Sequence, residues 1–490
     1  MQRTRQAVRV GKPSWWKTAC AACVVCAAAA SALPAQTFTT LVSFDYTDGA
    51  EPLVGLVQGN DGNLYGTASI GGANHQGAFF KMTPTGTLTT LYSFCSVLEN
   101  GFCQDGQYPL ALVQSSQNFY GTTENGGANG EGTVFAITPN GTLTTLYSFC
   151  SLSGCADGQV PLAGLVEATD GNFYGTTEFG GANGAGTVFK ISPTGTVTVL
   201  YSFCSQAGCA DGSRPYAALT QATDGNLYGT TFYGGTKGDG TVFKITPGGA
   251  LTTLHSFCSE SGCTDGSNPE AALVQGTDGN LYGTTEGGAH TLGSVFEITP
   301  TGALATLHSF DGADGQYPEA ALVQATDGSF YGTTVAGGAQ DYGMLFKITP
   351  SGTLTTLYTF CSQSGCTDGT SPYGGLAQDT NGTLYGTTGL GGPSGTCTLG
   401  CGTVFSLSVG LGPFVETQPT LGRYGVGVRI LGTNLTGATR VSFNGTTAIF
   451  TVVSTSLITT TVPVEASSGK VAVATPRGTL TSNVPFRVLP

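Results

Sequence analysis

The chain has 490 residues, of which 10% are charged and 77 are glycine, with a formal net charge of −13 at pH 7. Such an acidic surface repels phosphate backbones, which argues against nucleic acid as a partner. The apolar residues are numerous and patterned enough to build cores, so the composition excludes a disordered chain. The length allows two or three average domains, although a single repeat domain could use most of it.

Residues 1–35 have the pattern of a secretory signal peptide. Five basic residues precede an alanine-rich run from about Ala19 to Ala32, and a small residue, Ala35, stands before the expected cleavage point. The run is too short for a comfortable membrane span, and no other apolar stretch approaches the ~20 residues that a span requires. We therefore expect an exported protein without a transmembrane segment after cleavage. A retained N-terminal anchor is the alternative.

Twelve cysteines follow the signal region in six pairs that are close in sequence. An even number of local pairs behind a signal peptide predicts disulfides. Zinc is the weaker alternative, because a zinc site needs four ligands at one point and the chain has only four histidines. Each ring is small, so a bond would add only about 2 kcal/mol and would mainly stiffen an exposed loop. The predicted pairs are Cys95/Cys103, Cys150/Cys155, Cys204/Cys209, Cys258/Cys263, Cys361/Cys366 and Cys397/Cys401.

Seven copies of Tyr-Gly-Thr mark a tandem repeat, with intervals of 55, 54, 54, 54, 49 and 54 residues. Each unit holds four short β-type runs separated by glycine-rich turns. In the third unit these runs are 162–166, 173–177, 187–191 and 196–203. A repeat of this period without helical patterning predicts a β-propeller. The repeated tyrosines are Tyr65, Tyr120, Tyr174, Tyr228, Tyr282, Tyr331 and Tyr385.

The number of strands predicts how the propeller closes. Seven first strands and seven third strands can be found, but only six complete units end in a fourth strand. The missing fourth strand lies at the opposite end of the chain, as Thr37–Phe44, and we expect it to pair beside the run that ends near Leu407. This closure removes an unpaired sheet edge. We therefore predict an all-β fold with a seven-bladed propeller over residues 36–410. A linear solenoid, the alternative, would not need this match.

After Val409 the repeat ends. Residues 411–490 contain no cysteine, and they hold alternating runs at 426–430, 440–443 and 470–474 with turns at Asn444-Gly445 and Ser468-Gly469. Short strands over such a length predict a small β-sandwich.

The repeated phrase carries a family resemblance. Asp-Gly-Asn-Leu-Tyr-Gly-Thr-Thr, followed by Gly-Gly-Ala-Asn-Gly, Thr-Val-Phe-Lys-Ile-Thr-Pro and Leu-Thr-Thr-Leu-Tyr-Ser-Phe, resembles the Gloeo/Verruco (GloVer) tandem repeat of exported bacterial proteins, over about residues 37–409. That family is also described as choice-of-anchor for its varied C-terminal sorting signals, but nothing near Arg487–Pro490 resembles one. The tail, with 430–435 and 441–445, is similar to an IPT/TIG immunoglobulin-like domain. The resemblance implies location and fold, and no particular activity.

An Asp-Gly step recurs near the start of every unit and supplies the candidate ligand site. In the predicted propeller these loops share a face with the mouth of the central channel, where a ring of carboxylates could bind Ca²⁺ or a polyhydroxylated ligand. The alternative, which repetition in all units favours, is that each aspartate caps its own turn. The seven aspartates are Asp48, Asp105, Asp157, Asp211, Asp265, Asp314 and Asp368.

Positions that break the repeat are the better indicators of function. The Asp-Gly-Asn turns and the repeated tyrosines are interpreted as structural, the tyrosines packing between blades with bonded hydroxyls. Residues that differ between the units can determine binding specificity, although substitutions that accumulate on a surface without a function would give the same pattern. Around the start of the inner strands the variable residues are Arg214, Tyr216, Glu270, Tyr317, Glu319 and Tyr373.

Enzyme signatures are weak. The histidines lack metal-ligand spacing, and no serine lies in a Gly-x-Ser-x-Gly elbow with plausible partners. We therefore predict an exported, non-catalytic binding or surface-interaction protein, secreted or at the cell surface, with a glycan or a protein as ligand on the disulfide-braced face. Two alternatives stay open: an extracellular polysaccharide or lactone enzyme with a metal at the channel mouth, and a structural extracellular spacer.

Overall fold

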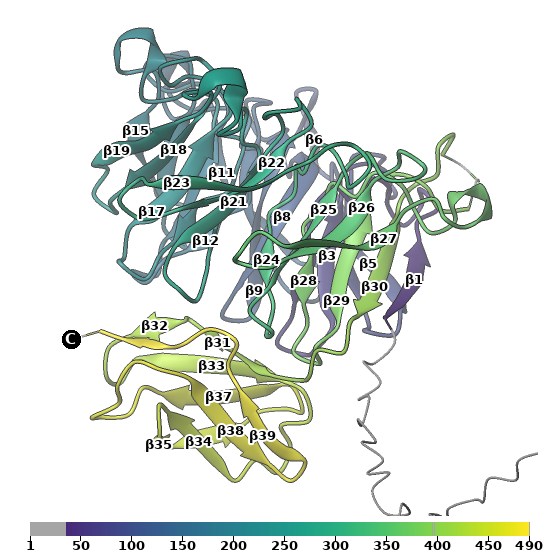
Figure 1. Cartoon of the computed structure of the whole chain (residues 1–490), viewed down its shortest axis with the longest axis vertical. Coiled ribbons are helices and arrows are strands. Elements are labelled where there is room, and N and C mark those ends of the chain that lie inside the picture. The colour runs from purple at the N-terminus through teal and green to yellow at the C-terminus, as the bar shows by residue number, and fades with distance from the viewer. Residues whose placement is uncertain (1–35, 394, 396, 490) are drawn as a thin grey trace, which may run out of the picture. The chain divides into compact units, whose positions relative to one another are not determined.

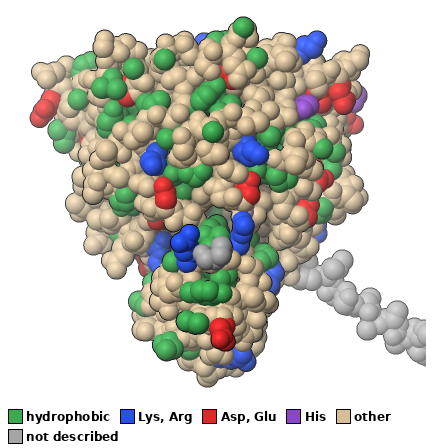
Figure 2. Space-filling view, turned by 90° about the vertical axis from the view of Figure 1, so that its left-hand side faces the viewer, with side chains coloured by type: hydrophobic (Ala, Val, Ile, Leu, Met, Phe, Trp, Pro, Cys, Tyr) green, Lys and Arg blue, Asp and Glu red, His purple; other side chains and the backbone are tan. Residues whose placement is uncertain are grey.

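The computed structural model describes residues 36–393, 395 and 397–489, so the predicted signal peptide at residues 1–35 lies outside the described residues. The all-β prediction is confirmed: regular structure in this part of the chain consists of β-strands and four 3-10 turns (Figure 1). Among the described residues, no helix has the length and apolar character that crossing a membrane requires. Charged side chains are sparse and scattered on the face shown in Figure 2.

Residues 37–408, as described, form seven four-stranded antiparallel sheets, which we number 1 to 7 in chain order. The first strands are β2 (Val57–Gln58), β8 (Gln107–Ser115), β12 (Val166–Glu167), β16 (Thr220–Gln221), β20 (Val274–Gln275), β24 (Val323–Gln324) and β28 (Ala377–Gln378). The second strands are β3 (Leu64–Ala68), β9 (Asn118–Asn125), β13 (Phe173–Thr177), β17 (Leu227–Thr231), β21 (Leu281–Thr285), β25 (Phe330–Thr334) and β29 (Leu384–Thr388). The third strands are β4 (Ala78–Met82), β10 (Thr133–Ile137), β14 (Thr187–Ile191), β18 (Thr241–Ile245), β22 (Ser294–Ile298), β26 (Met344–Ile348) and β30 (Thr403–Ser408). The fourth strands are β5 (Leu88–Ser93), β11 (Leu143–Ser148), β15 (Val197–Ser202), β19 (Leu251–Ser256), β23 (Leu304–Ser309), β27 (Leu354–Thr359) and, for sheet 7, β1 (Thr37–Ser43).

Strand β1 completes sheet 7, in the position that the sequence predicted for it. It pairs antiparallel with β30, Thr37 opposite Ser408 and Ser43 opposite Thr403. The Phe38 ring, from β1, lies 3.7 Å from the Tyr358 ring of sheet 6, centroid to centroid. The two ends of the repeat region are therefore hydrogen-bonded to each other.

The Tyr-Gly-Thr repeat joins neighbouring sheets, as sheet 3 shows. The Tyr174 ring is buried between sheets 3 and 4, and its hydroxyl donates to Asp170 Oδ2 at 2.9 Å. A Cβ at Gly175 would stand 2.7 Å from the Phe189 ring, so glycine is needed for packing. Thr176 Oγ1 donates to the Ala217 carbonyl of sheet 4 at 3.0 Å. Each residue of the motif thus has a packing reason to recur.

First strands are shorter than the sequence indicated, except in sheet 2. In sheet 3 only Val166–Glu167 pairs with the second strand, while residues 162–165 lie outside the ladder. The Ala163 carbonyl accepts its hydrogen bond from Thr122 of sheet 2, at 2.8 Å. Because a neighbouring sheet holds this inner segment, its side chains can face a space shared by all the sheets.

The contacts between sheets return from the last sheet to the first. Thr387 Oγ1 of sheet 7 donates to the Val54 carbonyl of sheet 1 at 3.1 Å, as Thr122 does to Ala163. One hydrophobic cluster joins sheets 7 and 1, through Val404 and Leu56 among others. Six further clusters join the successive pairs from sheets 1 and 2 to sheets 6 and 7.

Residues after 414 form separate sheets around their own core, in which Phe443 meets Phe486 edge to face with ring centroids 5.0 Å apart. One sheet contains β31 (Val415–Gln418), β33 (Gly427–Gly432), β37 (Leu457–Thr461) and β36 (Phe450–Val452). The other contains β35 (Thr446–Ala448), β34 (Arg440–Phe443), β38 (Val471–Thr475) and β39 (Gly478–Thr481). Strands β32 (Leu421–Gly422) and β40 (Arg487–Val488) pair in parallel.

All six predicted disulfides are present, at the predicted pairs of cysteines. Five of them close loops that lead from one sheet to the next. One such loop also contains the hairpin β6 (Leu98–Glu99) and β7 (Phe102–Cys103), and four contain the 3-10 turns η1 (Ser153–Cys155), η2 (Ala207–Cys209), η3 (Ser261–Cys263) and η4 (Ser364–Cys366). Six disulfides in one chain indicate an oxidising, extracellular environment.

The sixth disulfide, Cys397–Cys401, closes a loop inside sheet 7, between β29 and β30. The side chain of Cys401 is only 3% exposed. Cys401 belongs to the hydrophobic cluster that joins sheets 7 and 1, and its carbonyl accepts from the Glu51 amide at 3.0 Å. The physical reason for this burial is that Cys401 stands two residues before β30, where the chain has already entered the core, and a disulfide sulfur packs there as an apolar group.

Candidate functional site

The inner segments of the seven sheets line one cavity of about 770 Å³. Each segment begins with a proline, and the residue directly after that proline lines the cavity in every sheet. From sheet 1 to sheet 7 these residues are Leu53, Leu110, Leu162, Tyr216, Glu270, Glu319 and Tyr373. We call this set the post-proline ring.

The post-proline ring divides the cavity wall into an apolar and a polar part. Sheets 1 to 3 contribute three leucines, whereas sheets 5 and 6 contribute Glu270 and Glu319. Sheet 4, which contacts sheet 5, contributes Tyr216, and sheet 7, which contacts sheet 6, contributes Tyr373. The two tyrosines therefore come from the sheets on either side of those with the glutamates. Glu51, the residue before the proline of sheet 1, adds a third carboxylate to the lining. The cavity is therefore amphipathic.

The two ring glutamates are half-buried and unpaired. Burial, and then the neighbouring Glu286 carboxylate, raises the pKa of Glu270 to about 7. Burial, and then Glu270 and Glu286, raises the pKa of Glu319 to about 8. Within residues 36–393, 395 and 397–489, the carboxylate of neither ring glutamate has a hydrogen bond or an ion pair. Half-buried carboxylates without partners are costly in their charged form, and they are common where a ligand supplies the missing partner.

A third buried glutamate nearby differs from these two because it has partners. Glu178 accepts a hydrogen bond from the Tyr216 hydroxyl at 3.1 Å, and its Oε1 lies 3.7 Å from Arg214 Nη1. Burial raises the pKa of Glu178, although Tyr216 and Arg214 oppose this effect. The Tyr216 ring also packs against Phe232, with centroids 4.8 Å apart. These contacts hold Tyr216 at the cavity wall.

The structure brings together four of the six variable residues singled out from the sequence: Tyr216, Glu270, Glu319 and Tyr373. Arg214 and Tyr317, which precede the prolines, are not part of the lining. Sequence reasoning missed the three leucines, because an apolar residue at the start of a strand is typical of any core. Comparing the seven post-proline residues with one another would have found them.

The seven aspartates of the predicted acidic ring are not among the residues that line the cavity. Five of them are buried, with 0 to 3% of their surface exposed, and each accepts hydrogen bonds within its own loop. These are Asp105, Asp157, Asp211, Asp265 and Asp368. These are hydrogen bonds of the kind expected if each aspartate caps its own turn. A ligand-binding role for the seven aspartates stays a prediction.

Asp211 is a representative of the five. It accepts from the Tyr201 hydroxyl at 2.8 Å, from the Ser205 amide and hydroxyl at 2.9 and 2.8 Å, and from the Gln206 amide at 3.1 Å. Burial alone would raise its pKa, but these hydrogen bonds outweigh burial and lower the pKa. A carboxylate that is saturated by its own loop has little capacity left for a ligand.

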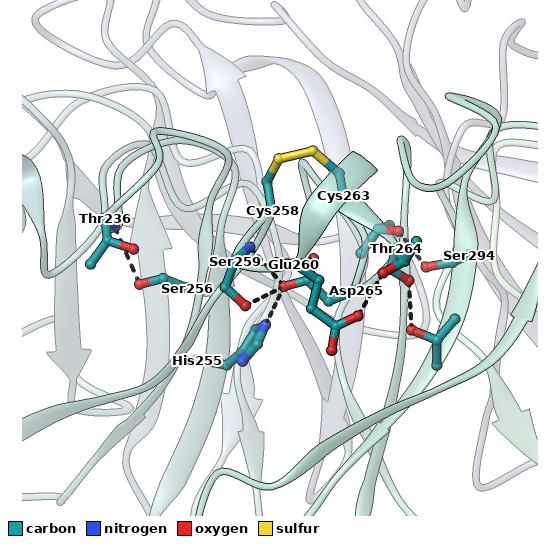
Figure 3. A network of polar contacts seen from close by, with 12 residues as sticks. Thr236, His255, Ser256, Cys258, Ser259, Glu260, Cys263, Thr264, Asp265 and Ser294 are labelled. Carbon is teal, nitrogen blue, oxygen red and sulfur yellow. Dashed lines mark hydrogen bonds and ion pairs between the residues drawn. A yellow bond between two sulfur atoms is a disulfide. The ribbon is translucent and has the colours of Figure 1, made fainter.

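In sheet 4 a histidine replaces the tyrosine of this network (Figure 3). His255 Nε2 lies 3.0 Å from Asp265 Oδ2, which also accepts from the Ser259 hydroxyl at 2.7 Å. The Cys258–Cys263 disulfide closes the same loop. Although serine, histidine and aspartate meet here, the aspartate stands between the other two. A nucleophilic triad needs the histidine in that position, so this is a structural network.

Asp48 and Asp314 belong to shorter loops without a disulfide and are more exposed than the other five. Asp48 accepts from the Asp45 amide at 3.0 Å, and Asp314 from the Asp311 amide at 2.9 Å. Asp314 Oδ2 also lies 2.7 Å from His308 Nε2. Among the residues that the structure describes, no group of three histidine, cysteine, aspartate or glutamate side chains is placed to hold a metal ion.

The chain belongs to the Gloeobacter/Verrucomicrobia repeat family, whose model matches residues 31–210 and 207–405. No curated protein matches the chain.

Solved structures resemble the chain distantly. A putative 6-phosphogluconolactonase from Bacteroides uniformis is 17% identical, with 62% of this chain and 83% of that chain covered and a TM-score of 0.42. A putative glucose dehydrogenase from Thermus thermophilus is 14% identical, with 76% and 100% covered and a TM-score of 0.39. A quinoprotein alcohol dehydrogenase-like protein from Bacteroides thetaiotaomicron is 12% identical, with 65% and 67% covered and a TM-score of 0.42. At this level of similarity none of these activities transfers to the chain.

Proposed function

We propose that this is an exported bacterial protein that binds a small ligand, without catalysis, in the cavity lined by the post-proline ring. In this proposal residues 1–35 are a signal peptide, residues 36–410 a closed seven-bladed β-propeller and residues 411–490 an IPT/TIG immunoglobulin-like domain. The antiparallel pairing of β1 with β30 and the return of contacts from sheet 7 to sheet 1 support the closed propeller. The disulfides support export.

One observation carries the binding proposal: the repeat is broken where the seven sheets converge. The seven units share most of their residues, but the post-proline position is leucine in some units, tyrosine in others and glutamate in others. The proline before this position recurs in all seven units, and the residue after it is an alanine or a glycine in six of them. Packing therefore accounts for these recurring positions, but not for the variation at the position between them. A cavity of about 770 Å³ lies within the range of ~300–1,000 Å³ that is typical of small-molecule sites.

The catalytic alternative depends on the same glutamates. A carboxyl with a raised pKa, such as that of Glu319, can act as a general acid near neutral pH. Assaying residues 36–490 against a panel of polysaccharides and lactones tests this alternative. Turnover that is lost in Glu319→Gln, in a variant that still folds, would replace binding by catalysis as the function.

The binding proposal is tested by narrowing the cavity. Leu162 lines the cavity, whereas Leu152 is 55% exposed in a loop outside it, so Leu162→Trp and Leu152→Trp form a matched pair. Thermal shifts of residues 36–490 and of both variants are measured with a library of saccharides, peptides, amines and organic acids. We expect compounds that stabilise the wild type to stabilise Leu152→Trp and to have no effect on Leu162→Trp. Circular dichroism verifies that both variants fold.

Two results would contradict the proposal. A library without any stabilising compound would leave the cavity without a ligand-binding role. Compounds that stabilise both variants equally would move the binding site away from the cavity, and the glycan or protein site predicted on the disulfide-braced loops would then be the next to examine.

A further inference from the structure

We infer that the cavity takes a small organic cation: an ammonium or guanidinium group carried on an apolar body. This inference rests on the proposed function and adds the chemical class of the ligand. It follows from three features of the wall, namely its charge, its aromatic residues and its apolar side.

The charge of the lining has one sign. Glu51, Glu270 and Glu319 line the cavity, and the described lining contains no lysine, arginine or histidine. Glu178, outside the lining, has Arg214 as a partner, whereas no cationic side chain in the described part of the chain pairs with a ring glutamate. An anionic ligand, or a neutral one without hydrogen-bond donors, would remove water from these carboxylates without pairing them, which is costly. A cationic ligand would favour the charged form of the two ring glutamates and donate charge-assisted hydrogen bonds to both.

The aromatic residues stand where a bound cation would meet them. Tyr216 and Tyr373 flank the two glutamates in the order of the sheets, and both line the cavity. Tyrosine rings attract cations through their electron-rich faces. Because its hydroxyl is engaged by Glu178, Tyr216 is already fixed at the wall before a ligand arrives. This fixation reduces the entropy that binding must overcome.

The apolar side determines what the cation is attached to. Leu53, Leu110 and Leu162 come from three consecutive sheets that do not carry the two ring glutamates, and small alanines such as Ala217 and Ala271 contribute to the lining. Burying an apolar group against them is favourable because it removes apolar surface from water. A bare metal ion would leave this surface unused, and no three carboxylates are placed to hold one among the described residues. An amphipathic amine matches both halves of the wall.

The test uses shape-matched ligands that differ in charge. Isothermal titration calorimetry of residues 36–490 compares phenethylamine, 2-phenylethanol and 3-phenylpropionate, and a second set compares cyclohexylmethylamine, cyclohexylmethanol and cyclohexanecarboxylate. We expect the amine of each set to bind at least tenfold more tightly than the alcohol, and the acid to bind most weakly. Glu270→Gln/Glu319→Gln is expected to lose at least tenfold of the amine affinity. Glu99→Gln, in the exposed hairpin β6–β7, is expected to lose none.

The outcomes separate this inference from the function on which it rests. Suppose that the alcohols or acids bind as tightly as the amines, and that this binding is lost in Leu162→Trp but kept in the double glutamine variant. The ligand would then not need to be a cation, but the cavity would still be the binding site. An absence of binding by all six compounds would overturn the amine class. If every library compound that stabilises the wild type also stabilised Leu162→Trp equally, the proposed function would be contradicted as well. Each single glutamine variant provides the same comparison if the double variant does not fold.

Discussion

Replacing Glu270 by glutamine should stabilise the protein at alkaline pH and leave it unchanged in acid. Burial and the Glu286 carboxylate raise the pKa of Glu270 from 4.5 to about 7 in the folded protein. Between these values the folded state holds a proton that the unfolded state has released. The contribution of protonated Glu270 to the stability of the folded protein is therefore complete below about pH 4.5 and is lost as the pH rises through about 7. Glutamine stays neutral throughout, so the variant avoids this loss.

The magnitude follows from the size of the pKa shift. One pKa unit corresponds to about 1.4 kcal/mol, so a shift from 4.5 to about 7 gives an upper value of about 3 kcal/mol. Glu270 is only half-buried, and solvent screening reduces this to about 2 kcal/mol. Charged Glu270 also helps to raise the pKa of Glu319 to about 8, and the glutamine variant removes this repulsion, so the difference should grow up to about pH 9.

The assay is urea unfolding of residues 36–490 at several pH values between 4 and 9. We expect Glu270→Gln to equal the wild type at pH 4 and to exceed it by about 2 kcal/mol at pH 8.5. Glu99→Gln, an exposed carboxylate, is the control and should follow the wild type. Curves for Glu270→Gln and the wild type that differ by the same amount at every pH would refute the reasoning, because the carboxyl would then not be perturbed by folding.

Three further predictions concern the scaffold. Asp211→Ala removes a buried carboxylate with four hydrogen bonds and should cost about 2–4 kcal/mol in thermal or urea unfolding. Glu99→Ala, in the exposed hairpin β6–β7, should cost less than about 0.5 kcal/mol. Unchanged stability of Asp211→Ala together with lost ligand binding would instead restore the acidic ring as a ligand site. Deleting residues 36–43 removes β1 and exposes the edge of β30, so size-exclusion chromatography should show aggregation, and a stable monomer would argue against closure through β1. Removing one short ring, in Cys150→Ala/Cys155→Ala, should lower stability by no more than about 2 kcal/mol and leave the far-ultraviolet circular dichroism unchanged; complete unfolding of this variant would contradict a role limited to stiffening its loop.

Local and periodic features of this protein could be predicted from its sequence. The disulfide pairs are a few residues apart, so few other pairings were plausible. The Tyr-Gly-Thr motif marked the second strands because its residues have the same packing neighbours in nearly every unit. The pairing of Thr37–Ser43 with Thr403–Ser408 spans almost the whole repeat region, but it was predictable by counting strands.

Only the tertiary structure decided which side chains meet. Asp211 and Glu270 both stand near the start of an inner strand, and the sequence offered the recurring aspartates as a candidate ligand ring and the variable Glu270 as a candidate for specificity. In the fold, the aspartate turns into its own loop, where backbone amides and hydroxyls satisfy it, while the residue after the proline lines the cavity. Residues about 50 positions apart then become neighbours across one small space. Periodicity shows that such residues are equivalent, but the direction of each side chain depends on how the backbone leaves the proline and on which partners lie within hydrogen-bonding reach.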